Sequence, residues 1–214
     1  MKLERLLGYP GEPRTVEDLH GRGYNFDPRR LRDLVVAEGW HHDDRRQPLP
    51  REPPGEPVPG GSFERAQALM RDYAFADGSA VRAIFQQDAP LEGRDMMLVG
   101  RFLGFDFRLG VRVGGVVDET REEDGRPVRV WGWYYRTLRG HLERGQMSYE
   151  VWKWLDTGEV EFRIAAVSQR ARVRNPLVRL GFALLGRREQ LKFYRHTCEV
   201  MARRTAELTS AAAG

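Results

Sequence analysis

The stretch WGWYYRTLRGHLERGQMSYEVWKW, from Trp131 to Trp154, holds two aromatic strand patterns on either side of a short polar loop. Gly140 and Gly145 bracket this loop, which carries His141 and Glu143. Because glycine adopts positive φ values without strain, the bracket predicts a tight reversal between two antiparallel strands. An aromatic wall beside a polar loop is also a combination found in small-molecule pockets.

The first half of this stretch has two faces with different side chains. Trp131, Trp133 and Tyr135 share one face, while Gly132 and Tyr134 lie on the other, because side chains alternate along a strand. The sequence leaves open which face meets the core. If the Trp131 face meets a covering helix, it lines a cavity there or packs in the core; if it faces outward, Gly132 leaves room for the helix backbone.

The same period of two continues on both sides and predicts an antiparallel sheet. Two turn signals separate the alternating segments, Asp124-Gly125 and Asp156-Thr157-Gly158. The segments are joined by hairpin-length loops, as antiparallel pairing permits. We expect about six or seven strands. The strand segments are 80–85, 95–103, 105–113, 131–135, 147–152 and 160–166, with a hairpin that joins about Val117 to Val128.

A long helix is predicted after the sheet, beginning at Pro176. Its apolar residues recur at spacings of three, four and seven and form one stripe. The stripe consists of Leu177, Leu180, Leu184, Leu191, Tyr194, Cys198 and Met201. Gly186 predicts a kink or break in this helix. Because the apolar face of a sheet must be covered, we predict an α+β fold in which a curved antiparallel sheet grips the C-terminal helix.

Proline marks the organisation of the N-terminal part. The segment QPLPREPPGEPVPG, residues 47–60, predicts an extended connector. A helix from Pro28 to about Gly39 is predicted before it, with Asp27 as its N-cap, and another from Phe63 to about Tyr73 after it. We expect a helical extension over residues 1–46, the connector over 47–60, the main domain over 61–209 and a disordered tail over 210–214.

Composition excludes several classes of protein. The chain has 214 residues, 41% of them hydrophobic, a net charge of +4 and one cysteine, so it can form a core without an internal disulfide. Without a secretory or membrane-spanning apolar run, we expect a cytoplasmic protein. Ten Lys or Arg residues against two Glu residues make Arg170–Arg204 basic. That segment permits peripheral membrane contact, but no nucleic-acid motif accompanies it, so a nucleic-acid partner is not expected.

Other reactive residues lack the pattern that their chemistry needs. The HHDD run from His41 to Asp44 is unaccompanied by a metal-binding motif, so no metal site and no cofactor are predicted. Cys198 lies in the apolar stripe, which favours a packed thiol over a nucleophile. Ser168 lacks the G-x-S-x-G context of a hydrolase nucleophile.

Three segments carry a resemblance to a known family: YYRTLRGHLERGQMSYEVW, GEVEFRIAAVSQRA and PLVRLGFALLGRREQLKFYRH. Together they resemble the DUF1990 (UPF0548) proteins, which are similar to the START/SRPBCC (Bet v 1-like) helix-grip domains. The resemblance covers about Phe63 to Arg204 and implies an apolar cavity between a sheet and a long helix. In helix-grip proteins such cavities hold lipids, hormones or polyketides. The first strand of such a domain would then come from residues before Gly60.

We therefore predict a binding protein, more than an enzyme, for a hydrophobic or amphipathic small molecule or lipid. His141 and Glu143 admit three interpretations: groups that fix the turn, ligand contacts, or an acid–base pair of a cyclase or hydrolase. An interaction module with the basic helix on a membrane is a further alternative. The candidate ligand-binding residues are Trp131, Trp133, Tyr135, His141, Met147, Tyr149, Phe107 and Leu184.

Overall fold

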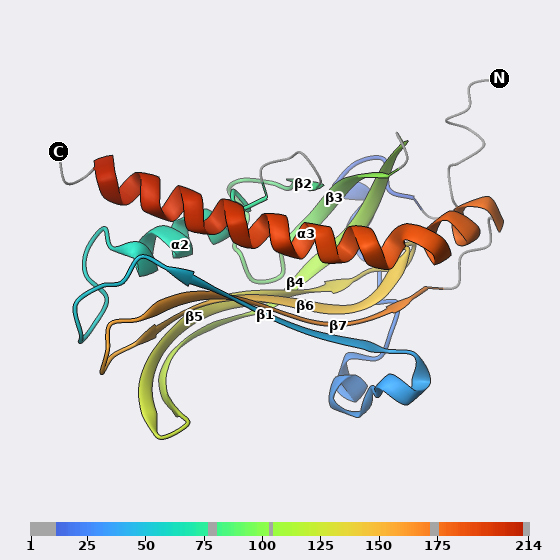
Figure 1. The fold of residues 1–214 in the computed structure, drawn as a ribbon. Coiled ribbons are helices and arrows are strands. Elements are labelled where there is room, and N and C mark those ends of the chain that lie inside the picture. Colours follow the sequence, from blue (N-terminus) through green and yellow to red (C-terminus); the bar gives the residue numbers. More distant parts are fainter. Residues whose placement is uncertain (1–11, 77–80, 103–104, 172–175, 212–214) are drawn as a thin grey trace.

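The fold is a curved seven-stranded antiparallel sheet crossed by one long helix (Figure 1), which confirms the predicted α+β helix-grip architecture. The computed structural model describes residues 12–76, 81–102, 105–171 and 176–211, with side chains of 101–105, 176–185 and 208–211 left out. The strands lie in the order β1-β7-β6-β5-β4-β3-β2. They are β1 His41–Leu49, β2 Val81–Ile84, β3 Asp95–Phe102, β4 Phe105–Glu123, β5 Arg126–Thr137, β6 Glu143–Trp154 and β7 Val160–Arg170.

Two α-helices cover one face of this sheet (Figure 1). They are α2, Ser62–Arg71, and α3, Pro176–Ala211. Of the kink or break predicted at Gly186, the break is wrong, because α3 runs through this residue without interruption. The helix also continues to Ala211, into the segment predicted as a disordered tail, while residues 212–214 lie outside the description. Among the described residues, no helix is long and apolar enough to cross a membrane.

The N-terminal part differs from the prediction. Two 3-10 helices, η2 Pro28–Asp33 and η3 Val36–Glu38, replace the α-helix expected from Pro28 to about Gly39, and a third, η1 Glu17–Leu19, precedes them. Asp27 does cap η2, where its side chain accepts a hydrogen bond from the Arg29 backbone N–H at 3.0 Å. Leu34 then has extended dihedral angles and ends the helical geometry. The two halves on either side of Leu34 are too short to form a stable α-helix.

The first strand of the sheet lies where the sequence analysis placed the extension and the start of the connector. The nine residues of β1, HHDDRRQPL, pair antiparallel with β7 from His41↔Ser168 to Leu49↔Val160. Most β1 side chains are exposed or intermediate, and Leu49 is the buried one. The segment therefore lacks the apolar alternation by which a strand is found in a sequence. Pairing with β7 along its whole length stabilises it instead.

The two turn signals are confirmed. Asp124 and Gly125 have φ values of 52° and 72°, the pair of positive values that a type I′ hairpin turn requires. Gly158 has a φ of 75° at the turn between β6 and β7. The long β4–β5 hairpin also contains a register shift between Val113 and Gly115, and such a bulge bends and twists a strand.

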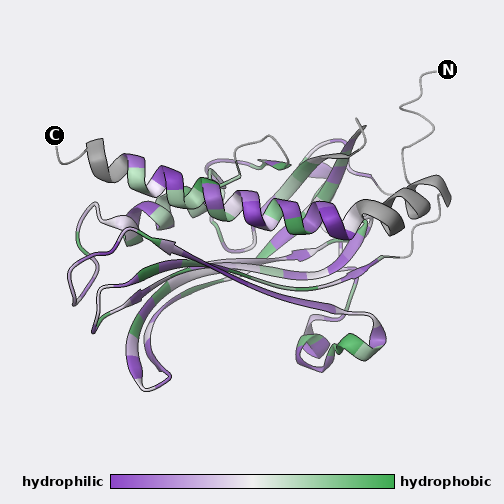
Figure 2. Cartoon of the chain, in the orientation of Figure 1, coloured by the Kyte–Doolittle hydropathy of each residue, from purple (hydrophilic) through white to green (hydrophobic). Residues whose placement is uncertain are grey.

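The structure settles which face of β5 meets the helices. Trp131, Trp133 and Tyr135 lie in the main core on the helix-covered face, together with Tyr194 and Cys198 of α3. Figure 2 shows the corresponding alternation of hydrophilic and hydrophobic residues along the long strands. Trp131 and Trp133 are only 2% and 1% exposed. Core packing, one of the two interpretations open for the Trp131 face, is therefore confirmed for these two residues.

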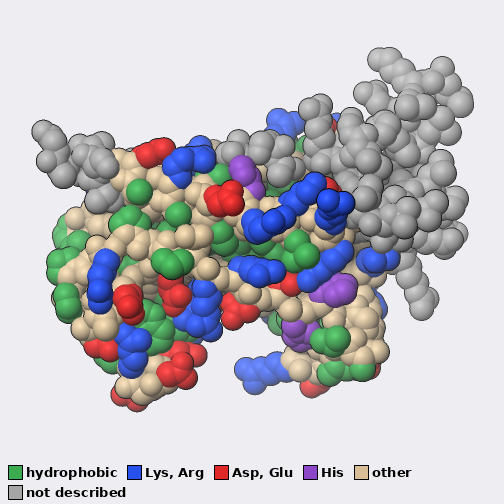
Figure 3. All heavy atoms as spheres, viewed as in Figure 1, with side chains coloured by type: hydrophobic (Ala, Val, Ile, Leu, Met, Phe, Trp, Pro, Cys, Tyr) green, Lys and Arg blue, Asp and Glu red, His purple; other side chains and the backbone are tan. Residues whose placement is uncertain are grey.

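Basic side chains gather along α3 and β1 on the face drawn in Figure 3. Several of these charges have acidic partners within the chain. Arg187 forms two 2.6 Å contacts with the carboxylate of Asp43, and Lys192 Nζ lies 2.7 Å from Glu189 Oε1. The local positive charge of α3 is thus smaller than its Lys and Arg content suggests.

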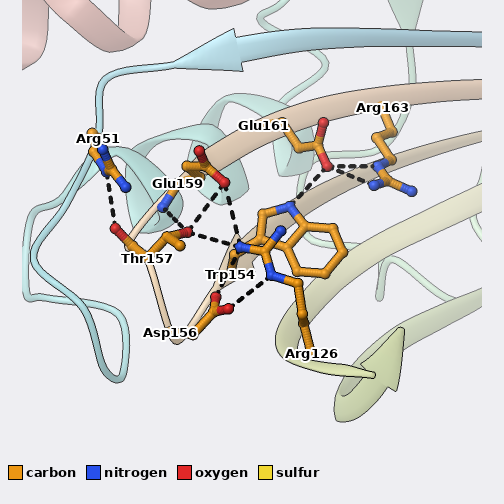
Figure 4. Close-up of polar contacts among 8 residues, drawn as sticks. All are labelled: Arg51, Arg126, Trp154, Asp156, Thr157, Glu159, Glu161 and Arg163. Carbon is orange, nitrogen blue, oxygen red and sulfur yellow. Dashed lines mark hydrogen bonds and ion pairs between the residues drawn. The ribbon is translucent and has the colours of Figure 1, made fainter. Parts of the chain in front are cut away.

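The opposite face of the sheet carries a second apolar cluster, formed by Val128, Val130, Trp152 and Trp154. Arginine side chains cover it: the Arg163 guanidinium lies 3.4 Å from the centre of the Trp152 ring, and that of Arg126 lies 4.4 Å from Trp154. Arg126 also binds both oxygens of Asp156 at 2.7 and 2.9 Å (Figure 4). Cation–π contacts of this kind stabilise tryptophan at a sheet surface.

The proline-rich connector is fastened to the sheet by a buried ion pair, which we call the clasp: Glu52 and Lys153. Lys153 Nζ donates to Glu52 Oε2 at 2.7 Å, and the two side chains are 0% and 3% exposed. Glu52 also accepts hydrogen bonds from the backbone N–H groups of Phe63 and Val58. Burial alone would raise the pKa of Glu52, but the hydrogen bonds from Lys153, Phe63 and Val58 outweigh it and lower that pKa.

Candidate functional site

A cavity of about 170 Å³ lies between the sheet and the middle of α3. For comparison, an apolar cavity of about 150 Å³ in a protein interior is large enough to bind benzene. The wall is mainly aliphatic and aromatic, with a few polar side chains from the start of β6 and from α3. The lining residues are Tyr73, Val81, Leu98, Gly100, Phe107, Leu109, Tyr135, His141, Leu142, Glu143, Met147, Gly186, Glu189, Gln190 and Phe193.

The cavity brings together part of the predicted site. Phe107, Tyr135, His141 and Met147 line it, as does Glu143, the second catalytic candidate. The other candidates lie elsewhere. Trp131, Trp133 and Tyr149 are packed in the core and are not among the lining residues, and the side chain of Leu184 lies outside the described residues.

Several lining residues were missed by the sequence analysis. Gln190 and Phe193 lie on α3 but outside the apolar stripe, so helical periodicity did not select them. Tyr73 follows α2 with a φ of 54°, a value rare for a residue other than glycine. Among these unpredicted lining residues, Gly186 could have been found from the sequence, because a glycine inside a helix often marks a packing or functional site.

Glycine geometry shapes the loop between β5 and β6. Gly140 and Gly145 have φ values of 95° and 146°, which confirms that both supply positive φ. A Cβ atom at Gly145 would lie 2.0 Å from the backbone oxygen of Val167 on the neighbouring strand. A side chain is therefore excluded at this position by both dihedral angle and space, and β6 can approach β7 closely beside the cavity.

The N-terminal segment holds the same loop from outside. Tyr24 forms an isolated β-bridge with Leu138, and Asn25 Nδ2 donates to the Glu143 backbone oxygen at 2.7 Å. The Thr137 hydroxyl donates to Asn25 Oδ1 at 2.6 Å and accepts from the Gly145 backbone N–H at 2.9 Å. These bonds join both ends of the loop to one residue of the N-terminal segment. The loop is thus rigidly placed at the edge of the cavity.

His141 is held by the backbone of Glu143 and not by its carboxylate. Its Nδ1 atom lies 2.9 Å from both the backbone nitrogen and the backbone oxygen of Glu143, so either neutral tautomer finds a partner there. Burial lowers the pKa of His141 to about 4, and the hydrogen bond to Glu143 offsets this only in part. The imidazole is therefore neutral near pH 7. This geometry matches the turn-fixing interpretation of His141.

The carboxylate of Glu143 lies toward α3, where Oε2 accepts a hydrogen bond from Gln190 Nε2 at 3.2 Å. Burial raises the pKa of Glu143 to about 7; Arg187 opposes this rise, and Asp43 adds to it. Arg187 is an incomplete counter-ion for Glu143, because it already forms the bidentate pair with Asp43. Glu143 is thus a half-buried carboxyl that titrates near neutral pH.

Three tyrosine hydroxyls in or near the cavity wall have weak hydrogen-bond partners. The hydroxyls of Tyr135 and Tyr149 both donate to Met147 Sδ, at 3.3 and 2.9 Å, and thioether sulfur is a weak acceptor. Tyr73 and Tyr149 place their hydroxyl oxygens 3.4 Å apart. Burial raises the pKa of Tyr73 to about 12, so these groups stay protonated.

The other candidate reactive residues have partners within the fold. His42 of the HHDD run bonds through Nε2 to the Leu34 backbone oxygen at 2.7 Å, and Asp43 pairs with Arg187. Within the described ranges, no group of three His, Cys, Asp or Glu side chains could hold a metal ion. Cys198 packs in the core, where burial raises the pKa of its thiol to about 11, as predicted for a packed cysteine. Ser168 Oγ lies 3.2 Å from Gln190 Nε2.

Comparisons with known proteins extend this description. The family model described as "Domain of unknown function (DUF1990)" matches residues 30–200. No curated protein matches the chain.

Among solved structures, Ara h 8.0201 is similar at 9% identity and a TM-score of 0.46 over 79% of this chain and 99% of its own. The hypothetical protein jhp0584 from Helicobacter pylori is similar at 12% identity and a TM-score of 0.45, covering 84% of this chain and 95% of its own. Human STARD10 is similar at 8% identity and a TM-score of 0.35, covering 83% of this chain and 82% of its own. Scores this low leave ligand and activity to be argued from this chain's own site.

Proposed function

The chain belongs to the DUF1990 family, a domain of unknown function, and on that premise we propose that it binds a small, mainly apolar molecule in the cavity between the sheet and α3. The observation that carries this proposal is the hollow itself. It lies at the place where His141, Glu143 and α3 meet. A concave, mainly apolar space with a few polar groups is the usual form of a small-molecule site.

The composition of the wall supports an amphipathic ligand. Val81, Leu98, Phe107 and Leu109 contribute apolar surface from β2, β3 and β4, whereas β6 and α3 contribute polar groups. Ligand sites typically combine a large apolar lining with a few placed polar groups that orient the ligand. The volume favours a compact molecule of about one ring over a long lipid chain. The predicted lipid ligand is thus narrowed to a small molecule.

The proposal is tested by filling the cavity from the helix. Gly186→Leu adds a side chain at a lining position of α3, and replacing a helical glycine by leucine also favours the helix. Titration calorimetry with benzyl alcohol is expected to give saturable binding to the wild type and none to Gly186→Leu. Ala206→Leu, on an exposed part of the same helix, is the control and should bind like the wild type.

Equal binding of benzyl alcohol to the wild type and to Gly186→Leu would place the binding site elsewhere. No detectable heat and no thermal stabilisation of the wild type by a panel of monocyclic compounds would contradict the proposal as a whole.

Catalysis is a second candidate, because Glu143 borders the cavity with a pKa of about 7, a value suited to general acid–base chemistry. The geometry departs from the predicted acid–base pair, since His141 is bound to the backbone of Glu143. A bound compound that is recovered chemically unchanged from both the wild type and Glu143→Gln supports binding alone. Conversion by the wild type and loss of conversion in Glu143→Gln would support catalysis.

A further inference from the structure

The charge of the cavity wall points to the kind of molecule that it accepts. Among the lining residues whose side chains the structure describes, the ionisable groups are carboxylates, tyrosines and one neutral histidine, with no Lys or Arg. The two carboxylates belong to Glu143 and Glu189. A wall of this composition disfavours an anionic ligand and offers nothing to neutralise one.

The two carboxylates differ in their partners. Glu189 is neutralised from the solvent side by Lys192, whose Nζ lies 2.7 Å from Glu189 Oε1. Glu143 accepts a hydrogen bond from the neutral amide of Gln190. Two arginines, Arg187 and Arg170, act on its carboxylate electrostatically, and Arg187 is already paired with Asp43. An ionised carboxylate can accept at about four positions, so Glu143 retains acceptor capacity at the cavity.

The side-chain amide of Gln190 is less available as a hydrogen-bond donor to a ligand, because its atoms already have partners in the chain. The Gln190 Nε2 atom already lies 3.2 Å from both Glu143 Oε2 and Ser168 Oγ, and Gln190 Oε1 accepts from Arg187 at 2.7 Å. The polar side of the cavity is therefore organised around an acceptor, the Glu143 carboxylate. A ligand with a positively charged donor would complement it through a charge-assisted hydrogen bond.

Aromatic side chains make up the rest of a site for a cation. Tyr73, Phe107, Tyr135 and Phe193 line the same cavity. The face of an aromatic ring attracts an ammonium group electrostatically, by about 0.5 to 2 kcal/mol depending on how far the group is desolvated. Aromatic rings together with one carboxylate are a suitable environment for an organic ammonium ion, and an unsuitable one for a carboxylate or phosphate.

We infer that the ligand is a small organic cation, a protonated amine on an apolar body of about one ring, with its ammonium group bound to the Glu143 carboxylate. This inference rests on the proposed binding function and adds the chemical class of the ligand. The size follows from the cavity of about 170 Å³ and the charge from the lining. Binding places a positive charge in direct contact with the Glu143 carboxylate, on which Arg187 and Arg170 act only by electrostatic attraction.

Three probes of nearly equal size test the inference: benzylamine, benzyl alcohol and benzoate. Titrations of the wild type at about pH 8, where benzylamine is cationic and Glu143 is ionised, are expected to give an affinity at least about tenfold higher for the amine than for the alcohol. Benzoate should bind most weakly. This comparison uses the unmodified protein, so it decides the question even if a variant fails to fold.

A pair of variants then assigns the preference to one carboxylate. Glu143→Gln should lose the preference for benzylamine and keep its affinity for benzyl alcohol, whereas Glu189→Gln should keep the preference because Lys192 already neutralises Glu189. Equal or tighter binding of the alcohol or of benzoate by the wild type overturns the inference and leaves the binding function standing. A preference that survives in Glu143→Gln also overturns it. Failure of all three probes to bind would contradict the binding function itself.

Discussion

Buried charged groups at the two ends of the sheet differ in how many partners they have. At the clasp, Lys153 and Glu52 are almost completely buried, and the carboxylate of Glu52 has an ion-pair partner and two backbone N–H donors. At the cavity, Glu143 has one amide donor, and its pKa is raised to about 7 by burial. The Glu52 carboxylate has a full set of partners and fixes the connector on the sheet. The Glu143 carboxylate can still accept hydrogen bonds beside the cavity.

This difference indicates where stability and function lie. A compensated buried pair fixes the position of the connector over the sheet but offers nothing to a ligand. An incompletely compensated group costs folding free energy and is found where a protein prepares to bind or react. The predictions below compare the two ends through variants that remove the same kind of group from each.

The largest effect is expected at the clasp. Lys153→Met leaves Glu52 buried without its counter-ion and should lower the free energy of unfolding by about 3 to 5 kcal/mol. Lys192→Met removes an exposed lysine from an ion pair and should change it by less than about 1 kcal/mol. Urea denaturation followed by circular dichroism measures both. Similar losses in the two variants would show that the clasp is not the stronger element.

The next largest effect is expected at Glu143 and depends on pH. The pKa of this carboxyl is about 7 in the folded chain against an ordinary value of 4.5, so the folded state binds more protons between these values and loses stability as pH rises. Glu143→Gln removes the loss. We compare the free energy of unfolding of the variant with that of the wild type at each pH. This difference, variant minus wild type, should rise by up to about 3 kcal/mol between pH 4.5 and pH 8.

His141 acts in the opposite direction, because its lowered pKa of about 4 makes stability fall as pH decreases from 6.5. This contribution is common to the wild type and Glu143→Gln and cancels in their difference. Urea denaturation of both proteins across this range checks the prediction. A difference that does not change with pH would mean that Glu143 titrates as an exposed carboxyl.

The smallest effect compares one hydroxyl from each end. Ser62 Oγ donates to the Pro50 backbone oxygen at 2.5 Å near the clasp, so Ser62→Ala should cost about 1 kcal/mol or more. The Tyr135 hydroxyl donates to Met147 Sδ, a weak acceptor, beside the hydroxyls of Tyr73 and Tyr149, and Tyr135→Phe should cost less than about 0.5 kcal/mol. Thermal unfolding of both variants gives the comparison. A larger loss for Tyr135→Phe would mean that the cavity end is as fully bonded as the clasp.

Local signals in the sequence predicted much of the fold. Asp124-Gly125 predicts its turn because positive φ values suit few other residues, and the stripe ending in Tyr194, Cys198 and Met201 predicts the buried side of α3. The family resemblance placed the first strand before Gly60, where β1 lies, but its bounds were not predicted, because β1 is mostly polar and is stabilised by its pairing with β7. Long-range pairing of this kind leaves no periodic pattern in the strand itself.

The site was predictable only in part, for a related reason. The loop glycines mark the position of His141 and Glu143, but the partners of these residues come from Asn25 and Gln190, far away in the sequence. The faces of β5 could not be assigned, since tryptophans occur on both faces of the sheet. Trp152 is buried on the outer face by arginine side chains, an arrangement that hydropathy alone does not reveal.

The central claim, that the hollow beside Glu143 binds a small molecule, is tested most directly by the methyl resonances of the methionines. Met147 lines the cavity, whereas Met97 lies in a separate cluster. With ¹³C-methyl methionine labelling, titration with benzylamine should shift the Met147 signal to saturation and leave that of Met97 unchanged. An unshifted Met147 signal across a panel of cationic and neutral monocyclic compounds, or shifts confined to Met97, would contradict the account.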